Sequence, residues 1–418
     1  MRIAIFVETY LPFINGVVTH VKALKEGLES LGHNVLVVSA YPNARRHYIK
    51  DGVLHCPSLR LKKLYGFGLA APVSRTRMKY LEEFNPDICH VHQEFGIGLF
   101  GVLAAGLLRK PIVYTLHTMY DEYIYYVAPW SLVPIARSVS HRYAKYIADR
   151  ACALTGPSDK VRQYFRSIGV TSPVTVIPNP VELDAFSPES VNSGAADMVR
   201  EKYNIGRDRT LALFVGRLGT EKSVHVVLDN WGQTISERDG LHLLIVGDGP
   251  ARGSLEEQAR RLGISGMVTF AGKVLHEKLP PYYAAGDAYV TASLSDTYSI
   301  SMLEAMAMGL PVIQRYDEMN KNQVVDGLNG YTFNGAEEMA AALKSIRDMP
   351  GGELADFRAA TRGSVKAFGS EDLGRALEIV YREAQLGYAA RRAGKRKLLL
   401  LPSRKSSKKD SGKSDKNE

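Results

Sequence analysis

Two carboxylates in the stretch SLSDTYSISMLEAMAMGLPVI have a spacing that suits a polar ligand. Asp296 lies in a polar loop after the strand-like run DAYVTAS, and Glu304 lies in a short helix that Gly309 and Pro311 end. A carboxylate accepts hydrogen bonds through both oxygens, which suits vicinal hydroxyls. Two carboxylates at this offset could hold two diols of one extended ligand. The same residues also fit a structural role, with Asp296 capping the helix and Glu304 paired on a surface.

Two cations occur in the stretch VGRLGTEKS, between a strand-like run and a helical one. Arg217 supplies a bidentate cation and Lys222 a point charge, and a helix N-terminus adds unpaired N–H groups, so this loop suits a diphosphate. The stretch FINGVVTH holds the equivalent place in the first half of the chain, where Gly16 would let a ligand approach the backbone. The alternative is that Gly16 only forms a turn and that the two cations are solvated surface charges.

The elements that must position these residues alternate along the chain. Apolar runs such as RIAIFVE and LHLLIVGDG alternate with amphipathic helices, which predicts parallel sheets with helices on both faces. We expect an α/β protein of two doubly wound, Rossmann-like domains that face a cleft, over residues 1–181 and 182–365. A helix over 366–390 would return toward the first domain, and 391–418 would be a basic, disordered tail. Ligands of such sheets bind at the carboxyl ends of the strands, where the residues above are expected.

The positive charge of the chain is concentrated at its end. The net charge is +9, and residues 391–418 carry eleven Lys/Arg against three Asp/Glu, so the remainder is nearly neutral. This distribution argues against nucleic acid and favours either an anionic lipid surface or a solubilising tail without a partner. No apolar run is long enough to span a bilayer, and the start MRIAIFV lacks the pattern of a signal peptide, so we expect a cytoplasmic protein.

The common cofactor motifs are missing from the sequence. GDGPARG does not complete a dinucleotide fingerprint, the Walker A pattern is absent, and no Asp-any-Asp pair is available to hold a divalent cation against a diphosphate. Lysine, arginine and helix dipoles would then neutralise a diphosphate. We therefore expect neither a cofactor nor an obligatory metal.

The ordered motifs of the chain resemble those of glycosyltransferase family 4, the retaining enzymes of GT-B fold. The resemblance extends to about residue 390 and rests on NGVVTHVKALKEGLESLGHNVLVV, TLHT, TGPS, VIPNPVELDAF, VGRLGTEKS, LLIVGDGP and SDTYSISMLEAMAMGLPVI. Within the family, TLHTMYDEYIYYV is similar to the bacterial synthases that move glucose from UDP-glucose to diacylglycerol.

The resemblance implies a role for each matching residue. The implied donor-binding residues are Gly16, Arg217, Lys222, Asp296, Ser299, Ile300 and Glu304. The implied catalytic residues are His117, Arg217, Lys222 and Asp296. Among them, Gly16, Arg217 and Lys222 would hold the donor diphosphate.

The resemblance implies that the two carboxylates bind the hydroxyl groups of the donor. Glu304 would bind the ribose hydroxyls and Asp296 those of the transferred sugar, while His117 would lie near the sugar and the acceptor. The sequence departs from the family's pattern twice, because the family's usual glutamate is Asp296 here and its usual Phe-Gly is Tyr298-Ser299. These departures leave the identity of the donor sugar open.

The acceptor side is expected in the segment MYDEYIYYVAPWSLVPIARSVSHRYAKYIADRA. The candidate acceptor and membrane residues are Tyr120, Tyr123, Tyr126, Trp130, Arg137 and Lys145. A helix that combines aromatic and basic residues is typical of interfacial membrane binding. Alternatively, the aromatics are core residues and the charges form a solvated face.

These observations predict a retaining glycosyltransferase. By the resemblance, it would move a hexose, glucose, from a UDP-sugar to a lipid, 1,2-diacylglycerol, as a peripheral protein on the inner, cytosolic face of an anionic membrane. Because the sequence offers no clear covalent nucleophile, we expect a front-face displacement in which the leaving diphosphate accepts the acceptor's proton. Three alternatives stay open: transfer to a soluble or phosphoinositide-like acceptor, a sugar-nucleotide 2-epimerase, and a catalytically silent protein that binds a nucleotide sugar.

Overall fold

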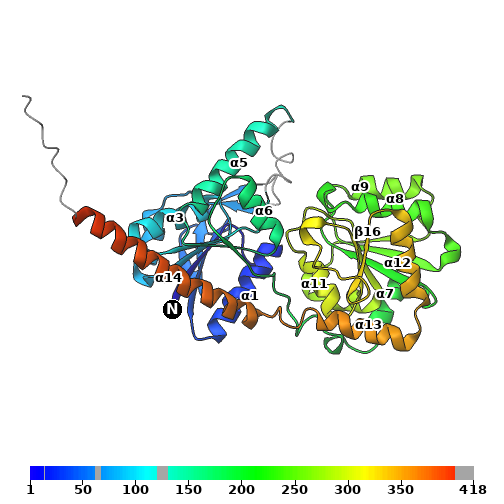
Figure 1. The fold of residues 1–418 in the computed structure, drawn as a ribbon. Helices are drawn as coiled ribbons and strands as arrows, with labels where there is room; N and C mark the ends of the chain where they lie inside the picture. Colours follow the sequence, from blue (N-terminus) through cyan, green and yellow to red (C-terminus); the bar gives the residue numbers. More distant parts are fainter. Residues whose placement is uncertain (14, 62–66, 120–129, 401–418) are drawn as a thin grey trace, which may run out of the picture.

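The computed structural model describes residues 1–13, 15–61, 67–119 and 130–400. Two sheets with helices around them lie side by side (Figure 1). The first sheet has eight strands in the order β10-β9-β8-β7-β1-β2-β4-β3, and the second has six in the order β13-β12-β11-β14-β15-β16. All neighbouring strands pair in parallel except β3 and β4. The prediction of two doubly wound Rossmann-like units is therefore confirmed.

The strands match the apolar runs of the sequence. The first sheet contains β1 (Arg2–Val7), β2 (Asn34–Tyr41), β3 (Tyr48–Lys50), β4 (Val53–Pro57), β7 (Ile88–Val91), β8 (Ile112–Thr115), β9 (Ala153–Gly156) and β10 (Val174–Val176). The second contains β11 (Thr210–Val215), β12 (Leu241–Val246), β13 (Val268–Gly272), β14 (Ala288–Thr291), β15 (Val312–Arg315) and β16 (Gly330–Phe333). A separate hairpin pairs β5 (Leu59–Leu61) with β6 (Phe67–Leu69). Central strands such as β1 and β12 are buried on both faces, which explains their continuous apolar sequence.

Helices cover both faces of each sheet. Around the first are α1 (Gly16–Ser30), α2 (Arg75–Phe84), α3 (Gly96–Leu108), α5 (Val133–Ala148), α6 (Asp159–Ser167) and α14 (Ser370–Leu400). Around the second are α7 (Ala195–Lys202), α8 (Val224–Thr234), α9 (Arg252–Arg261), α10 (Pro280–Ala285), α11 (Ile300–Ala307), α12 (Ala336–Asp348) and α13 (Gly351–Gly363). Short 3-10 turns are η3 (Trp130–Leu132), η4 (Pro188–Ser190), η5 (Thr220–Lys222), η6 (Glu237–Asp239), η7 (His276–Lys278) and η8 (Glu318–Asn320).

Helix α14 leaves the second unit and returns along α1 of the first (Figure 1). The two helices approach closely at small residues, because a Cβ atom on Gly27 would stand 1.9 Å from the carbonyl oxygen of Ser370. Leu373 and Leu377 of α14 are buried in the same core cluster as Leu24 of α1. The helix extends to Leu400, so it runs past the predicted end at residue 390.

Two segments outside the sheets, the end of α14 and the stretch after β10, are helical. Helix α14 includes residues 391–400, for which disorder was predicted, because the helix continues through the basic run and neither Gly387 nor Gly394 ends it. The rest of the predicted tail lies outside the described residues. The stretch between β10 and the second sheet contains helix α7, whose Val199 is buried in the second unit's core.

The strand orders place a switch point in each sheet. In the first, β1 lies between β7 and β2, and in the second, β11 lies between β12 and β14. Loops that leave neighbouring strands in opposite directions open a crevice at such a point. The loops after β1, β7, β11 and β14 are therefore the places where a ligand is expected.

Candidate active site

The loops after β11 and β14 bring Lys222 and Asp296 together. The Lys222 ammonium donates a hydrogen bond to Asp296 Oδ1, and both side chains are about three-quarters buried. Burial alone would raise the pKa of Asp296, but the charge of Lys222, hydrogen bonds from Lys222 and Ser293, and the charge of Lys160 hold the pKa below its ordinary value. Asp296 is therefore an ionised carboxylate next to a cation.

Arg217 lies at the base of the same loop. Its guanidinium is 3.5 Å from Glu221 Oε1, and the Glu221 side chain is almost completely buried. Ser295, from the loop after β14, donates a hydrogen bond of 3.0 Å to the Glu221 carbonyl. The two loops are thus tied to each other, and they present the Arg217 and Lys222 cations on one side of the second sheet.

The N-terminus of α1 faces the N-terminus of α11. A Cβ atom on Gly16 would lie 3.6 Å from the Ile300 side chain, so these two predicted donor residues meet across the two units. Ser299 caps α11, since its side chain accepts a hydrogen bond from the Met302 N–H. The alternative in which Asp296 caps this helix is wrong, because Ser299 is the N-cap residue and Asp296 pairs with Lys222 instead.

Glu304 lies deeper in α11 and is 3% exposed. His276 Nε2 is 2.7 Å from its Oε1, and the Tyr283 hydroxyl donates a 2.7 Å hydrogen bond to its Oε2. The alternative of a surface pair is therefore wrong. Burial lowers the pKa of His276, but the hydrogen bond and charge of Glu304 outweigh it and raise the pKa above the ordinary value. Ribose hydroxyls could reach Glu304 only by replacing or joining these partners.

His117 follows β8 and belongs to a cluster of histidines. His117 Nε2 is 2.8 Å from Nδ1 of His92, which follows β7, so one ring donates and the other accepts. The ring of His20, from α1, packs edge-on against His117 at 4.5 Å. His90 lies two residues before His92, and its ring centroid is 4.0 Å from that of His92. Burial lowers the pKa of all four rings, that of His20 to about 4, so the cluster is neutral.

Polar contacts hold the two edges together at this point. The Thr297 hydroxyl donates to the His117 carbonyl at 3.0 Å, and Asn179 Nδ2 donates to the Tyr298 carbonyl at 2.8 Å. Lys160 of α6 is 2% exposed, donates to the Leu294 carbonyl and lies 3.4 Å from Asp317 Oδ2. These contacts bring His117 of the first unit next to the Asp296 loop of the second.

The predicted acceptor residues lie elsewhere or cannot be followed. Tyr120, Tyr123 and Tyr126 lie outside the described residues, and so does the side chain of Trp130. Arg137 is exposed on α5, which stands clear of the body (Figure 1). Lys145, also on α5, is partly exposed and contacts groups of the protein itself, since its ammonium is 3.1 Å from Asp149 Oδ1 and 2.8 Å from the Gly169 carbonyl.

Several residues of the site escaped prediction. The sequence alone assigned no role to three of them: His20 in FINGVVTH, His92 after the strand that ends at Val91, and Lys160 just after TGPS. The placement of His92 in the sequence could have identified it. His92 and His117 each follow a strand by one or two residues, and these strands are neighbours in the sheet. His276 gave no such signal, because its contact with Glu304 depends on the packing of η7 against α11.

Comparisons with known proteins agree with this geometry. The model described as Glycosyltransferase Family 4 matches residues 14–185, and the one described as Glycosyl transferases group 1 matches residues 209–348. A crystal structure of Anabaena Alr3699/HepE in complex with UDP and glucose has a TM-score of 0.70 and 16% sequence identity, covering 91% of this chain and 99% of that one. Two Rossmann-like units with their switch points in contact define the class as GT-B glycosyltransferases.

Two curated relatives narrow the class. The alpha-monoglucosyldiacylglycerol synthase of Acholeplasma laidlawii is 33% identical over 360 residues, which cover 84% of this chain and 89% of the relative. The enzyme of the same name from Streptococcus pneumoniae (strain ATCC BAA-255 / R6) is 29% identical over 343 residues, which cover 82% and 77%. The chain belongs to glycosyltransferase family 4 and is a glycosyltransferase. Among the described residues, none of the helices has the length and apolar character needed to cross a membrane.

Proposed function

We propose that this enzyme transfers a hexose, glucose by analogy with its relatives, from a UDP-sugar to 1,2-diacylglycerol with retention of configuration, on the cytosolic face of a membrane. One observation carries the proposal: Lys222 and Asp296 form an ion pair beside His117, in a chain that is 33% identical to an alpha-monoglucosyldiacylglycerol synthase over 84% of its length. A cation, an ionised carboxylate and a neutral imidazole are the groups that a diphosphate, a sugar and an acceptor hydroxyl would need.

The reaction would centre on the leaving diphosphate. Lysine has three N–H donors, so Lys222 could keep its bond to Asp296 and still bind a phosphate oxygen, with Arg217 as the second cation. The bond from the sugar C1 to the diphosphate oxygen breaks, and the acceptor oxygen bonds to C1 from the same face. The acceptor's proton passes to the leaving diphosphate oxygen. Fixed cations next to the developing negative charge would supply the largest part of the rate enhancement.

The carboxylates would hold the two ends of the donor. Asp296, ionised and partly exposed, is available to the hydroxyls of the sugar. Glu304 would take the ribose hydroxyls if the nucleoside displaced His276 from Oε1, a contact at the edge of the buried carboxylate. His117, whose imidazole is neutral, would accept or donate a hydrogen bond to the acceptor hydroxyl or the sugar.

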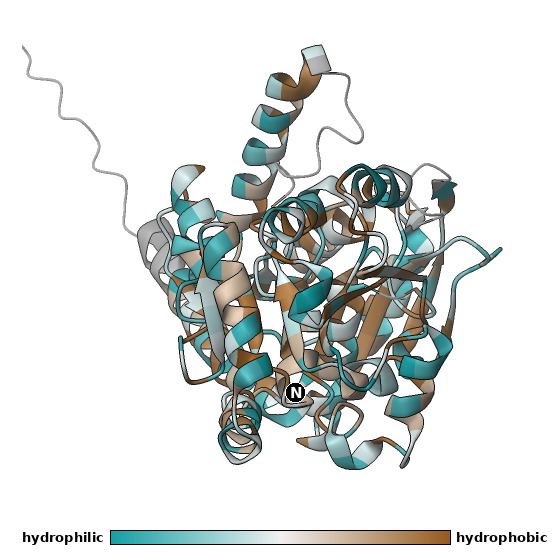
Figure 2. Cartoon of the chain, turned by 90° about the vertical axis from the view of Figure 1, so that its right-hand side faces the viewer, coloured by the Kyte–Doolittle hydropathy of each residue, from teal (hydrophilic) through white to brown (hydrophobic). Residues whose placement is uncertain are grey.

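Helix α5 supports a membrane surface as the location of the acceptor. Leu132, Ile135 and Val139 are 49%, 62% and 61% exposed and follow each other at three- and four-residue steps, so they form an apolar stripe. Arg137 is exposed on the same helix. Figure 2 shows the helix projecting from the body with hydrophobic and hydrophilic residues along it. An exposed apolar stripe with basic residues fits the interface of an anionic bilayer.

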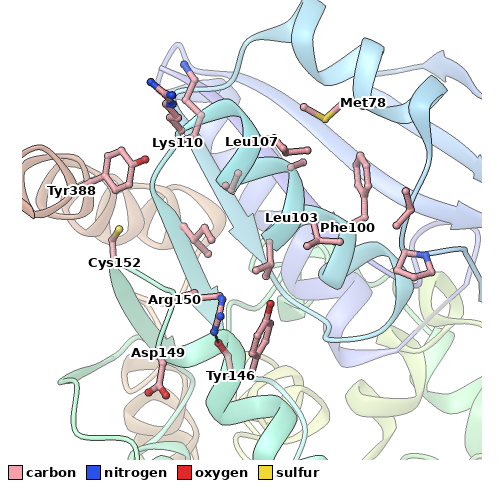
Figure 3. A pocket seen from close by; sticks show the side chains of 18 of the residues that line it. Met78, Phe100, Leu103, Leu107, Lys110, Tyr146, Asp149, Arg150, Cys152 and Tyr388 are labelled. Atoms are coloured by element: carbon pink, nitrogen blue, oxygen red, sulfur yellow. Dashed lines mark hydrogen bonds between the residues drawn. The ribbon is translucent and has the colours of Figure 1, made fainter. Parts of the chain in front are cut away.

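A groove at the base of α5 adds to this surface (Figure 3). It has a volume of about 1090 Å³, and Phe100, Leu103 and Leu107 of α3 line it. The basic residues around it are Arg75, Arg109, Lys110, Arg150, Arg391 and Arg392. Apolar walls with a basic rim complement an anionic amphiphile, and the groove joins α5 to the basic end of α14.

The test is a transfer assay with product identification. Purified full-length protein is incubated with labelled UDP-glucose and vesicles that contain diacylglycerol and an anionic phospholipid. We expect a labelled monoglucosyl lipid with the α configuration. Parallel reactions offer UDP-galactose or GDP-mannose as donor, and phosphatidylinositol or free sugars as acceptor. A product only with those acceptors would replace the proposed one, and conversion of the donor without any acceptor would favour an epimerase.

A chelator reaction belongs to the same assay. Because the proposed charge stabilisation comes from Arg217 and Lys222, EDTA should leave most of the transfer intact. Complete loss of transfer in EDTA, restored by a divalent cation, would contradict a metal-independent reaction.

A further inference from the structure

Three histidines from three elements converge beside the Asp296 loop. One ring nitrogen from each of His20, His92 and His117 can be chosen so that all three lie within 4.8 Å of one another. His20 comes from α1, His92 from the end of β7 and His117 from the end of β8. His20 and His92 are 2% and 1% exposed, while His117 is partly exposed and closes the cluster on its open side.

The protonation of His20 follows from its neighbours. Asn179 Nδ2 donates to the Tyr298 carbonyl at 2.8 Å, so the amide must turn its oxygen toward His20. Asn179 Oδ1 is 3.0 Å from His20 Nδ1, which therefore carries the proton and donates it. His20 Nε2 then carries a lone pair. Within the described part of the chain, this buried atom has no hydrogen-bond partner.

His92 also has a ring nitrogen without a partner among the described residues, and His90 does not. The Nε2 atom of His92 is also buried without a hydrogen-bond partner among the described residues. His90 uses both nitrogens, since its Nδ1 is 2.8 Å from the Tyr381 hydroxyl and its Nε2 is 2.7 Å from the Thr115 hydroxyl. Two of the four neighbouring histidines thus have ring nitrogens to offer to a ligand, and a third is fully engaged in the fold.

We propose that His20, His92 and His117 form a binding site for a divalent transition ion of the zinc type, and that occupation of this site blocks glycosyl transfer. Three imidazoles with a fourth position left open are a common donor set for zinc. With Zn–N distances of about 2.0–2.1 Å, tetrahedral geometry puts the ligand nitrogens roughly 3.3 Å apart, so ring nitrogens that lie within 4.8 Å of one another would move closer when the ion binds. The bond from His20 to Asn179 is the outer-shell contact that orients a metal-binding histidine.

The ion would act as an inhibitor and not as a cofactor. Binding it takes the lone pair of His117 and separates His117 from His92, so His117 could no longer contact the acceptor or the sugar. The inhibition rests on the proposed function, because it assumes that His117 takes part in transfer. The binding itself does not rest on that function and is measured separately.

The binding test uses full-length protein without a polyhistidine tag. Metal-free protein is titrated with Co²⁺, whose ligand-field absorption reports four-coordinate nitrogen ligands, and Zn²⁺ is then added as a competitor. We expect one ion per chain, displaced by Zn²⁺. His20→Gln, His92→Gln and His117→Gln should each lose the spectrum. Asn179→Ala should weaken binding by roughly 10–100-fold, as the loss of an outer-shell contact does.

Two further histidines provide matched controls. His90→Gln removes a buried histidine of the same cluster that has no nitrogen to offer, and His225→Gln removes an exposed one, so both should keep the spectrum. Circular dichroism checks that each variant is folded. Absence of a spectrum in the wild type, or a spectrum that survives in folded His20→Gln and His92→Gln, would overturn the site.

The transfer assay then separates the two claims. Zn²⁺ at the concentration that fills the site should abolish transfer, and EDTA should restore it. If Co²⁺ and Zn²⁺ bind as predicted but transfer continues unchanged, the inhibitory role is wrong. If metal-free protein never transfers a sugar to any acceptor, the proposed function fails while the binding result stands.

Discussion

The two sheets meet at edges that differ in charge: the side chains of one edge are neutral and those of the other are ionised. The first unit contributes four neutral histidines, whose pKa values burial holds below the ordinary value. The second contributes ionised groups, Lys222 with Asp296 and Arg217 near Glu221. Both edges lie at the switch point of a doubly wound sheet, so topology alone does not distinguish them. Their chemistry does, because fixed charge suits a diphosphate and neutral imidazoles suit an uncharged hydroxyl.

The largest effect should come from removing a cation of the charged edge. Lys222→Ala and Arg217→Ala should each reduce transfer by on the order of 10²–10³, because a fixed donor to developing charge is lost. Lys321→Ala is the matched control, since Lys321 is an exposed lysine of the same unit that pairs only with Glu318 among the described residues. Initial rates of transfer measure all three variants. Near-normal rates in both Lys222→Ala and Arg217→Ala would rule out the diphosphate role.

Substitutions of the two carboxylates of the charged edge should affect ligand binding differently. Asp296→Asn removes charge-assisted hydrogen bonds to the sugar, worth about 1.5–3 kcal/mol, but leaves Lys222 free to bind phosphate, so UDP should still bind well. Glu304→Gln should weaken UDP and UDP-glucose alike, because both contain the ribose. Calorimetric titration of the two ligands measures this difference. Equal loss of UDP affinity in the two variants would contradict the proposal that Asp296 binds the sugar and Glu304 binds the ribose.

Asp296→Glu sharpens the same comparison. It restores the acid that is usual in the family and adds one methylene, so we expect transfer to continue, with a changed preference among donor sugars. Initial rates with UDP-glucose and UDP-galactose measure the preference. An inactive but folded Asp296→Glu would mean that the length of this side chain is fixed by Lys222 and not by the sugar.

Binding of the first unit to a membrane can be tested separately from the two edges. Replacing Ile135 and Val139 by serine removes the apolar stripe of α5, and truncation after Leu386 removes basic residues worth about 1 kcal/mol each near an anionic surface. Both changes should weaken sedimentation with anionic vesicles, and the truncation should also reduce its dependence on salt. Met198→Ser, at an exposed position of the second unit, is the control. Wild-type protein that ignores anionic vesicles at low salt would favour a soluble acceptor.

The smallest effect concerns the pair of His276 and Glu304. The pKa of His276 is raised in the folded protein, so its contribution to stability is present below about pH 6.5 and is lost as the pH rises through the raised value. His276→Gln should therefore lower the melting temperature by roughly a few degrees at pH 6 and by less at pH 9. A melting difference that is constant across this range would show that the histidine is not charged in the fold.

The sequence predicted the strands and helices of the molecule better than the contacts between its side chains. Long apolar runs such as those of β1 and β12 identified the central strands, because strands buried on both faces need continuous apolar sequence. Short edge strands such as β3 and β16 carry no such run and were missed. The length of α14 was underestimated because its basic end resembles a disordered tail in composition.

The site was predictable as a set of loops but not as a set of pairs. Lys222 and Asp296 are 74 residues apart, so no local spacing joins them, although both follow neighbouring strands. His20 and His92 were overlooked because an isolated histidine in a motif is usually a structural residue. Their unpartnered nitrogens became visible only when Asn179 and His117 were placed around them.

The most direct test of the central claim is the affinity of UDP for two variants, one from each edge. Calorimetric titration of UDP into Lys222→Ala and His117→Gln compares the charged edge with the neutral one. The account predicts that Lys222→Ala loses roughly 10-fold or more in affinity, the value of a charged hydrogen bond, while His117→Gln binds UDP as the wild type does and fails only in transfer. If His117→Gln loses as much UDP affinity as Lys222→Ala, the separation of donor and acceptor between the two edges is contradicted.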